Sequence, residues 1–120
     1  MKNGREIKFR GKSLDNGEWV YGSLIQWRKD KFTIHNLDGN IAVDHTSVGQ
    51  YTGLKDKNGK EIYEGDIVRY YDDIEDDLVD GVVSYKADYC SFAVESEKRD
   101  PVTLSAFWQF EVIGNTTDKY

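Results

Sequence analysis

The sequence has little of several residue types, and each shortage excludes a class of protein. Its single cysteine, Cys90, leaves no partner for an internal disulfide and no cysteine pair for a zinc site. No apolar run approaches the roughly 20 residues that cross a bilayer as a helix, and the first residues lack the apolar core of a signal peptide. We therefore expect a cytoplasmic protein with no membrane partner.

Helix-forming stretches are also missing. The chain has no uninterrupted amphipathic stretch of helical length. Apolar residues instead recur at every second position in short runs closed by Gly, Asn and Asp, which is typical of half-buried strands. In the first such run we expect Ile7 and Phe9 to face the interior. With 120 residues, enough for a single small domain, the sequence predicts an all-β, or mainly β, fold.

The strands expected from this pattern are short. They cover residues 6–10, 18–27, 32–35, 41–44, 67–71, 81–85, 89–94 and 107–113. Gly22 interrupts the second of them and predicts a bulge there. Residues 72–80 carry six carboxylates that would repel one another if packed together, so we expect an exposed loop. Residues 102–106 are expected to form a short helical turn or a loop.

The net charge of -6 is unevenly distributed along the chain. Residues 1–31 carry eight Lys or Arg against four Asp or Glu, a balance of +4. Residues 61–80 carry nine acidic residues against one arginine, a balance of -8. This asymmetry fits two chains docking end to end, and it fits a charged ligand or simple solubility as well.

The order of elements in the second half of the chain suggests a particular architecture. A Gly-Asp turn at residues 65–66, an apolar strand, a polar excursion and a returning strand together predict a small SH3-like barrel, whose curled strands remove open edges. We expect a single domain over residues 1–120, with an additional N-terminal β-sheet region at 1–48 and the barrel-like region at 49–120.

One long stretch of this region resembles a known family. Residues 50–68, QYTGLKDKNGKEIYEGDIV, resemble the signature of the YopX family of phage and prophage proteins. Residues 5–11 and 111–115 also resemble this family, while the tail from Asn115 onward departs from its pattern. The resemblance implies a mainly β protein with an SH3-type barrel component, encoded by bacteriophages or prophages and acting in the bacterial cytoplasm. It implies no established activity and supplies no catalytic residues.

No arrangement of reactive side chains predicts an enzyme. Glu64 and Asp66 flank a glycine, and we expect Asp66 to hold a turn through backbone N–H groups rather than a metal. His35 and His45 lack the spacing of a zinc site, and Cys90, within a strand pattern, is expected to be a small core residue. We therefore expect no catalytic residue, no cofactor and no metal. A small metal-dependent enzyme is kept as a third hypothesis, behind the two binding functions given below, because carboxylates are plentiful.

The basic residues supply one candidate binding site. Lys8, Arg10 and Lys12 alternate with apolar residues, so they are expected to line the exposed face of one strand, with a second basic group following Trp27. Basic side chains beside aromatic rings can contact phosphates and stack on bases, although solvated strand faces are often rich in Lys and Arg as well. The six candidate nucleic-acid contacts are Lys8, Arg10, Lys12, Arg28, Lys29 and Lys31.

The acidic segment and one aromatic run supply the other candidate site. Charged segments steer association and set register, and an alternating strand at residues 107–110, FWQF, could not hide both of its faces without a covering subunit. The candidate interface residues are Asp72, Asp73, Asp76, Asp77 and Trp108. The leading hypothesis is a non-enzymatic module that assembles as a homo-oligomer or with a host or phage protein. The alternative is a nucleic-acid-associated β-barrel module that uses the basic N-terminal strand.

Overall fold

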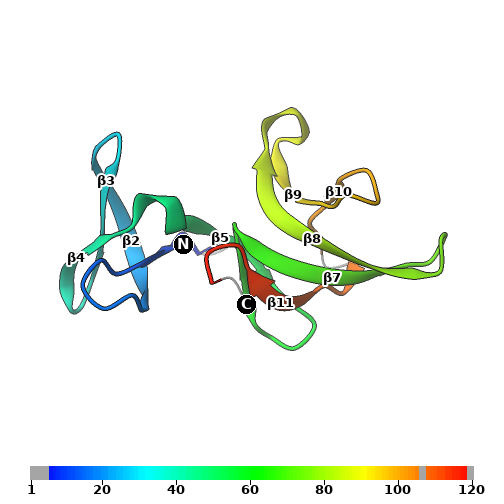
Figure 1. Cartoon of the computed structure of the whole chain (residues 1–120), viewed down its shortest axis with the longest axis horizontal. Coiled ribbons are helices and arrows are strands. Elements are labelled where there is room, and N and C mark those ends of the chain that lie inside the picture. The colour runs from blue at the N-terminus through cyan, green and yellow to red at the C-terminus, as the bar shows by residue number, and fades with distance from the viewer. Residues whose placement is uncertain (1–5, 106–107, 119–120) are drawn as a thin grey trace. The chain divides into compact units, whose positions relative to one another are not determined.

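The computed structural model describes residues 6–105 and 108–118, and its architecture is all-β. Figure 1 shows strands joined by turns and short loops. Helical segments in these residues are limited to short 3₁₀ turns such as η1 (His45–Ser47) and η2 (Ala87–Tyr89). In this part of the chain no helix has the length and apolar character needed to cross a membrane.

The strands form two antiparallel sheets. The first contains six strands in the order β4-β3-β2-β1-β5-β6, and the second contains five in the order β10-β9-β8-β7-β11. The bounds in the first sheet are β1 (Phe9–Lys12), β2 (Trp19–Arg28), β3 (Lys31–Asn36), β4 (Gly39–Val43), β5 (Gly49–Lys55) and β6 (Glu61–Tyr63). Those in the second are β7 (Asp66–Asp72), β8 (Asp77–Lys86), β9 (Ser91–Glu95), β10 (Val102–Thr103) and β11 (Glu111–Asn115).

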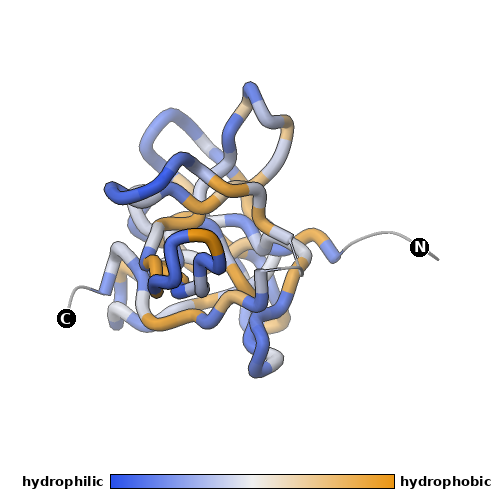
Figure 2. Tube along the Cα trace, turned by 90° about the vertical axis from the view of Figure 1, so that its right-hand side faces the viewer, coloured by the Kyte–Doolittle hydropathy of each residue, from blue (hydrophilic) through white to orange (hydrophobic). Residues whose placement is uncertain are grey.

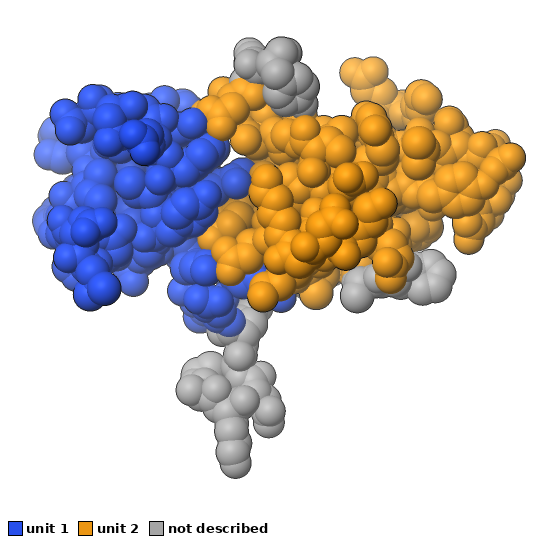
Figure 3. Space-filling model, turned by 90° about the horizontal axis from the view of Figure 1, so that it is seen from below, with its two compact units in different colours: residues 1–53 blue, residues 54–120 orange. Residues whose placement is uncertain are grey.

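The chain divides into two compact units, residues 1–53 and residues 54–120 (Figure 3). In unit 1 the buried apolar side chains include Ile34, Val43 and Tyr51. The predicted hairpin at residues 32–44 is confirmed as β3 and β4, with Ile34 opposite Ile41. Along the chain, polar and apolar residues alternate over short distances (Figure 2), as the period-two pattern requires.

Strand β2 changes partner at Gly22. Its first four residues pair with β1, up to Phe9 opposite Gly22, and from Ser23 onward it pairs with β3. The predicted bulge at Gly22 is wrong, because the register shift in β2 lies between Gln26 and Arg28. A glycine is needed here for space: an added Cβ would lie 2.3 Å from the carbonyl oxygen of His35.

Unit 2 is built around one apolar cluster. Its buried members are Ile62, Val68, Tyr70, Val79, Val83, Val94, Leu104 and Phe110. Strands β7, β8 and β9 supply most of them at alternate positions, so one face of the five-stranded sheet covers the core. Within the described residues the strand pairing of this sheet is open, with β10 and β11 at its edges.

Several expectations about unit 2 are wrong. Residues 102–103 form the short strand β10 in place of the expected helical turn or loop. Residues 72–80 do not form one loop, since β7 runs to Asp72 and β8 begins at Asp77. The expected strand at 107–113 begins only at Glu111, because Gln109 before it adopts a left-handed φ of 56°. Phe107 lies outside the described residues. Cys90 is exposed rather than in the core, because it ends η2 in a left-handed conformation with φ 52°.

Two buried carboxylates hold backbone amides in unit 2. Asp66 is 1% exposed and accepts a hydrogen bond from the Tyr63 amide at 2.7 Å, which confirms its expected role in the turn. Asp56, which the sequence analysis did not single out, accepts hydrogen bonds from the amides of Asn58, Lys60 and Val112 at 2.9–3.0 Å. Asp56 therefore joins its own turn to β11.

Replacing Gly22 by alanine should destabilise the protein strongly, because the new Cβ meets the rigid carbonyl of His35. We expect the free energy of unfolding to fall by about 2–3 kcal/mol in urea titrations. Gly39→Ala is the control: Gly39 also has a positive φ, of 110°, but an added Cβ there meets nothing within 4 Å. The control should lose only about 1 kcal/mol from backbone strain, and equal losses would contradict this account.

Replacing Asp56 by asparagine should remove a stabilisation that depends on pH. Burial of the Asp56 carboxyl favours a higher pKa, but the amides of Val112, Lys60 and Asn58 outweigh it, and the pKa lies below the usual 3.8. A lowered folded-state pKa stabilises the fold above pH 3.8, and this contribution disappears as the pH falls through the folded-state value. At pH 7 Asp56→Asn should cost about 1–3 kcal/mol.

Chemical denaturation at several pH values measures this difference. The gap between Asp56→Asn and the unmodified protein should close in acid, while Asp38→Asn, at an exposed turn residue, should show little change at any pH. A gap that stays constant down to pH 2 would show that the Asp56 charge is not what stabilises the turn.

Candidate interaction surfaces

Strands β7 and β8 form a long hairpin whose turn is made by residues 73–76. Asp72 lies opposite Asp77 in the register. A carboxylate oxygen of Asp72 accepts hydrogen bonds from the amides of Ile74 and Glu75 at 3.0 and 3.3 Å. Asp76 adopts a left-handed φ of 54°, and its carboxylate accepts a hydrogen bond from the Tyr71 hydroxyl. Short acidic side chains are therefore part of what shapes this turn.

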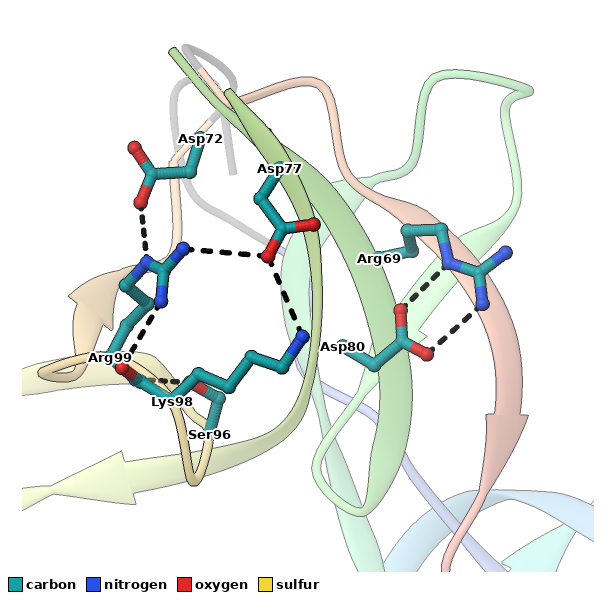
Figure 4. Close-up of polar contacts among 7 residues, drawn as sticks. All are labelled: Arg69, Asp72, Asp77, Asp80, Ser96, Lys98 and Arg99. Carbon is teal, nitrogen blue, oxygen red and sulfur yellow. Dashed lines mark hydrogen bonds and ion pairs between the residues drawn. The ribbon is translucent and has the colours of Figure 1, made fainter. Parts of the chain in front are cut away.

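A neighbouring loop supplies cations to the base of this turn (Figure 4). Arg99 Nε lies 2.7 Å from Asp72, and its terminal nitrogen lies 3.6 Å from Asp77. Lys98 Nζ lies 3.5 Å from Asp77, and Ser96 Oγ accepts the Arg99 amide at 3.1 Å. The hydrogen bond from Arg99 lowers the pKa of Asp72 below its usual value, against the opposing effect of burial.

A second ion pair crosses the hairpin further along. Arg69 and Asp80 are opposite each other in register and form two hydrogen bonds, of 2.7 and 3.0 Å. This forked geometry is the strong form of an arginine–carboxylate contact, and it lowers the pKa of Asp80. Three of the six carboxylates expected to repel one another, Asp72, Asp77 and Asp80, are thus paired with cations, which lets strands replace most of the predicted loop.

The far end of the hairpin has a different character. Asp73, Glu75 and Asp76 are exposed, and the same end of the hairpin carries three exposed apolar side chains: Ile74 is 92% exposed, Leu78 55% and Tyr71 47%. Single exposed apolar residues are common on proteins, but a group of them rimmed by polar residues marks an interaction site. We call Tyr71, Asp73, Ile74, Glu75, Asp76 and Leu78 the acidic hairpin end.

The basic side chains of β1 and of Lys8, which precedes it, lie against aromatic rings in unit 1. The Arg10 guanidinium is 4.3 Å and the Lys12 Nζ 4.7 Å from the centre of the Trp19 ring, and Lys8 Nζ is 5.4 Å from that of Tyr51. Arg10 is only 6% exposed, so the expectation that it lies on an exposed strand face is wrong. Cation–π attraction and burial of the long aliphatic stem account for this.

Ile7 is also placed differently from its expected interior position. It is 61% exposed and precedes β1, which begins at Phe9. The apolar alternation therefore predicted that this strand exists, but it did not predict which of its side chains are buried. The flanking strands β2 and β5 cover the basic face with aromatic rings.

The other predicted basic residues lie at the turn between β2 and β3. Arg28 is paired with Lys31 across the turn, and Arg28, Lys29 and Lys31 are all exposed. Trp27 beside them is 59% exposed, with its indole N–H donating to Thr33 Oγ1 at 3.0 Å. We call Trp27, Arg28, Lys29 and Lys31 the basic hairpin end.

The two predicted groups of cations are not brought together. Strand β1 pairs with β2 only as far as Gly22, six residues before Arg28. At the usual rise of a strand this separation is about 20 Å. A single continuous basic face built from all six residues is therefore absent from the described structure.

Trp108 packs against the core of unit 2. Its ring makes an edge-to-face contact with Tyr70 at 5.1 Å between centroids, and it lies against the core cluster that contains Phe110. Because Trp108 and Phe110 both contact the core, the argument that one strand face needs a covering subunit loses its basis.

Other candidate ligands do not form a site in the described residues. His35 Nδ1 lies 3.1 Å from Asn40 Oδ1, and His45 is exposed in η1. Residues 6–105 and 108–118 hold no group of three His, Cys, Asp or Glu side chains that could bind a metal ion.

The sequence analysis missed the cations that hold the acidic hairpin. Lys98 and Arg99 form a basic pair between two predicted strands, and their opposite charge to residues 72–77 was the available signal. The carboxylates that they contact are set by the path of the chain between β9 and β10. That path depends on tertiary packing and cannot be read from the neighbouring residues.

The chain matches the model of one protein family. A family model described as YopX protein matches residues 8–118. The matched range takes in every strand from β1 to β11. No curated protein matches the chain.

Replacing Arg99 by glutamine should loosen the base of the acidic hairpin, because Asp72 and Asp77 both lose a cation. Hydrogen exchange at the amides of residues 73–75 and 96–100 should become faster at pH 7, while the core of β8 keeps its protection. Lys98→Gln is the control, since it removes one contact of 3.5 Å to Asp77 and leaves the 2.7 Å Arg99–Asp72 pair intact.

The effect of Arg99→Gln should also depend on pH. Because the pKa of Asp72 is lowered in the folded state, the contribution of the pair is present above pH 3.8 and is lost as the pH falls through the folded-state value. Unchanged exchange at pH 7, or the same change in both variants, would show that the Arg99–Asp72 pair does not hold the loop.

Proposed function

The chain belongs to the YopX family, and we propose that it is a non-enzymatic phage or prophage accessory protein that binds another protein in the cytoplasm of the bacterial host. The observation that carries this proposal is the acidic hairpin end, where Tyr71, Ile74 and Leu78 stay exposed within a rim of carboxylates. Burial of such apolar side chains supplies affinity, and the surrounding charges steer and orient the encounter.

The hairpin is held in place before any partner arrives. Arg69–Asp80 ties its two strands together, and Arg99 ties its base to the loop that follows β9. A preorganised surface loses less conformational entropy on binding than a loose one does. This supports protein binding at the hairpin end, in preference to a role of the acidic residues as a solubilising loop.

A shallow groove extends the same surface along the sheet. It has a volume of about 370 Å³ and begins at Leu78. Its walls combine the apolar side chains Ile67 and Val82 with charged groups from Asp80, Glu95 and Lys98. An apolar floor with a few polar groups suits an extended segment or a loop of a partner protein.

We also propose that unit 2 has the arrangement of an SH3-like barrel. Strands β7, β8, β9 and β10 follow one another as a meander, and β11 returns to pair with β7. Gly81 supports strong curvature in β8, since an added Cβ would lie 2.6 Å from Val94 Cγ1, and β8 bends along its length (Figure 1). A five-stranded sheet in this order curls around a single core.

Nucleic-acid binding is the second candidate function, and the basic hairpin end favours it. Trp27 is 59% exposed beside three exposed cations, a combination that suits stacking on bases and contact with phosphates. The net charge of -6 and the engagement of the β1 cations with Trp19 and Tyr51 argue against a broad nucleic-acid surface.

Site-specific photo-crosslinking in host cells carrying the phage or prophage tests both candidates. With a photoreactive residue in place of Ile74, we expect adducts to one protein, identified by mass spectrometry, that disappear when Tyr71 and Leu78 are changed to serine. The control position is Leu37, a fully exposed apolar residue of unit 1, which should give no such adduct.

The outcomes separate the two hypotheses. A photoreactive residue in place of Trp27 should remain free of nucleic acid, and an adduct to RNA or DNA there, with none at residue 74, would favour the second candidate. No specific adduct at residue 74, or the same adduct from residue 37, would overturn the proposed protein-binding role of the acidic hairpin end.

A further inference from the structure

We infer that the acidic hairpin end binds the basic hairpin end of a second copy of this chain, so that copies associate head to tail. This inference rests on the proposed function, since it takes the acidic hairpin end to be a protein-binding surface and names its partner.

Several charged side chains elsewhere in the chain are already paired with one another. In unit 2, Arg69, Lys86, Lys98 and Arg99 form ion pairs with carboxylates at 2.7–3.6 Å. The hairpin ends differ from their surroundings in this respect. Across residues 6–105 and 108–118, the ion pairs involve neither the acidic end's Asp73, Glu75 and Asp76 nor the basic end's Arg28, Lys29 and Lys31.

The two ends complement each other in charge. One presents three carboxylates and the other presents three cations, reduced by the single carboxylate of Asp30 in the same turn. Opposite patches of this kind raise the rate of encounter and fix the register of the contact, while like ends repel one another. Contact between two acidic ends or between two basic ends is disfavoured, which leaves the head-to-tail arrangement.

The apolar side chains complement each other as well. The basic end carries Trp27, whose indole is oriented by its hydrogen bond to Thr33, and the acidic end carries Ile74 and Leu78. Tryptophan and arginine are the side chains most often found at the energetic centre of an interface, where they pack against apolar partners. Two hairpin ends bury a small area, so the contact is weak and sensitive to salt.

A contact between two different surfaces of the same protein can repeat from one copy to the next. Each copy keeps one unused end of each kind after the first contact, so further copies add until a ring closes or a filament grows. The expected behaviour is therefore an average mass that rises gradually with concentration above the 13.8 kDa of one chain.

Charge reversal of each end tests the inference by sedimentation velocity and light scattering. Lys29→Glu with Lys31→Glu makes both ends acidic, and Asp73→Lys with Glu75→Lys makes both ends basic. We expect each double variant alone to lose self-association by about tenfold or more in the association constant. An equimolar mixture of the two should associate again, and so should the quadruple variant, in which the two ends have exchanged charge.

The matched control is Lys55→Glu with Lys60→Glu, which changes the net charge by the same amount at two exposed lysines outside the ends. It should associate like the unmodified protein, and circular dichroism confirms that each variant is folded. Raising the salt from about 50 to 500 mM should reduce the association of the unmodified protein, because the Debye length falls severalfold.

Two results would overturn the inference: a mass of 13.8 kDa at every concentration for the unmodified protein, or reversed variants that associate alone as well as it does. Either result leaves the proposed function testable separately, because crosslinks from residue 74 to a different protein would retain protein binding with another partner. Crosslinks from residue 74 to nothing, together with a constant monomer mass, would remove both.

Discussion

The pairing of acidic residues with arginines is the interaction on which the β7–β8 hairpin, and the surface that it presents, depend. A segment with a carboxylate at almost every second position would not be expected to pair as a strand, yet β8 begins inside it. Arg69 and Arg99 make this arrangement stable by meeting Asp80 and Asp72 at 2.7 Å. The hairpin then carries Asp73, Glu75 and Asp76 to its end, where none of them takes part in an ion pair of the described residues.

The same division between paired and exposed charge appears in unit 1. Lys8, Arg10 and Lys12 are drawn onto the rings of Trp19 and Tyr51, so this strand uses its cations to complete its own packing. Charge that is used in this way contributes to the fold and is poorly placed to contact a ligand. Among the described residues no cation–π contact involves the cations of the β2–β3 turn, and these cations are exposed to solvent.

The local pattern of the sequence predicted the all-β architecture and most of the strands. The hairpin at residues 32–44 and the strand that begins after Gly65 are confirmed because each depends on alternation and turn residues close together in the chain. The role of Asp66 is confirmed for the same reason, since it accepts a hydrogen bond from Tyr63, three residues away.

The errors arise where distant segments decide the outcome. Asp56 meets Val112, Asp72 meets Arg99, and Arg10 meets a ring on the neighbouring strand, and none of these contacts follows from residues nearby in sequence. Cys90 was assigned to the core from its apolar neighbours, but a turn of 3₁₀ helix before it changes the direction of the chain. The sequence suggests one basic surface made of the N-terminal strand and the β2–β3 turn. In the fold the two groups of cations are apart, because β2 leaves β1 at Gly22 and pairs with β3 from Ser23 onward.

One edge of the five-stranded sheet has a further consequence. Strand β10 is two residues long and directly follows Pro101, which has no amide hydrogen to donate. Such a short edge strand exposes few unpaired N–H and C=O groups with which a strand of another chain could pair. Short edge strands are one way in which β proteins avoid edge-to-edge pairing and amyloid-like aggregation. A crowded solution of this protein should therefore stay free of cross-β deposits nucleated on that side.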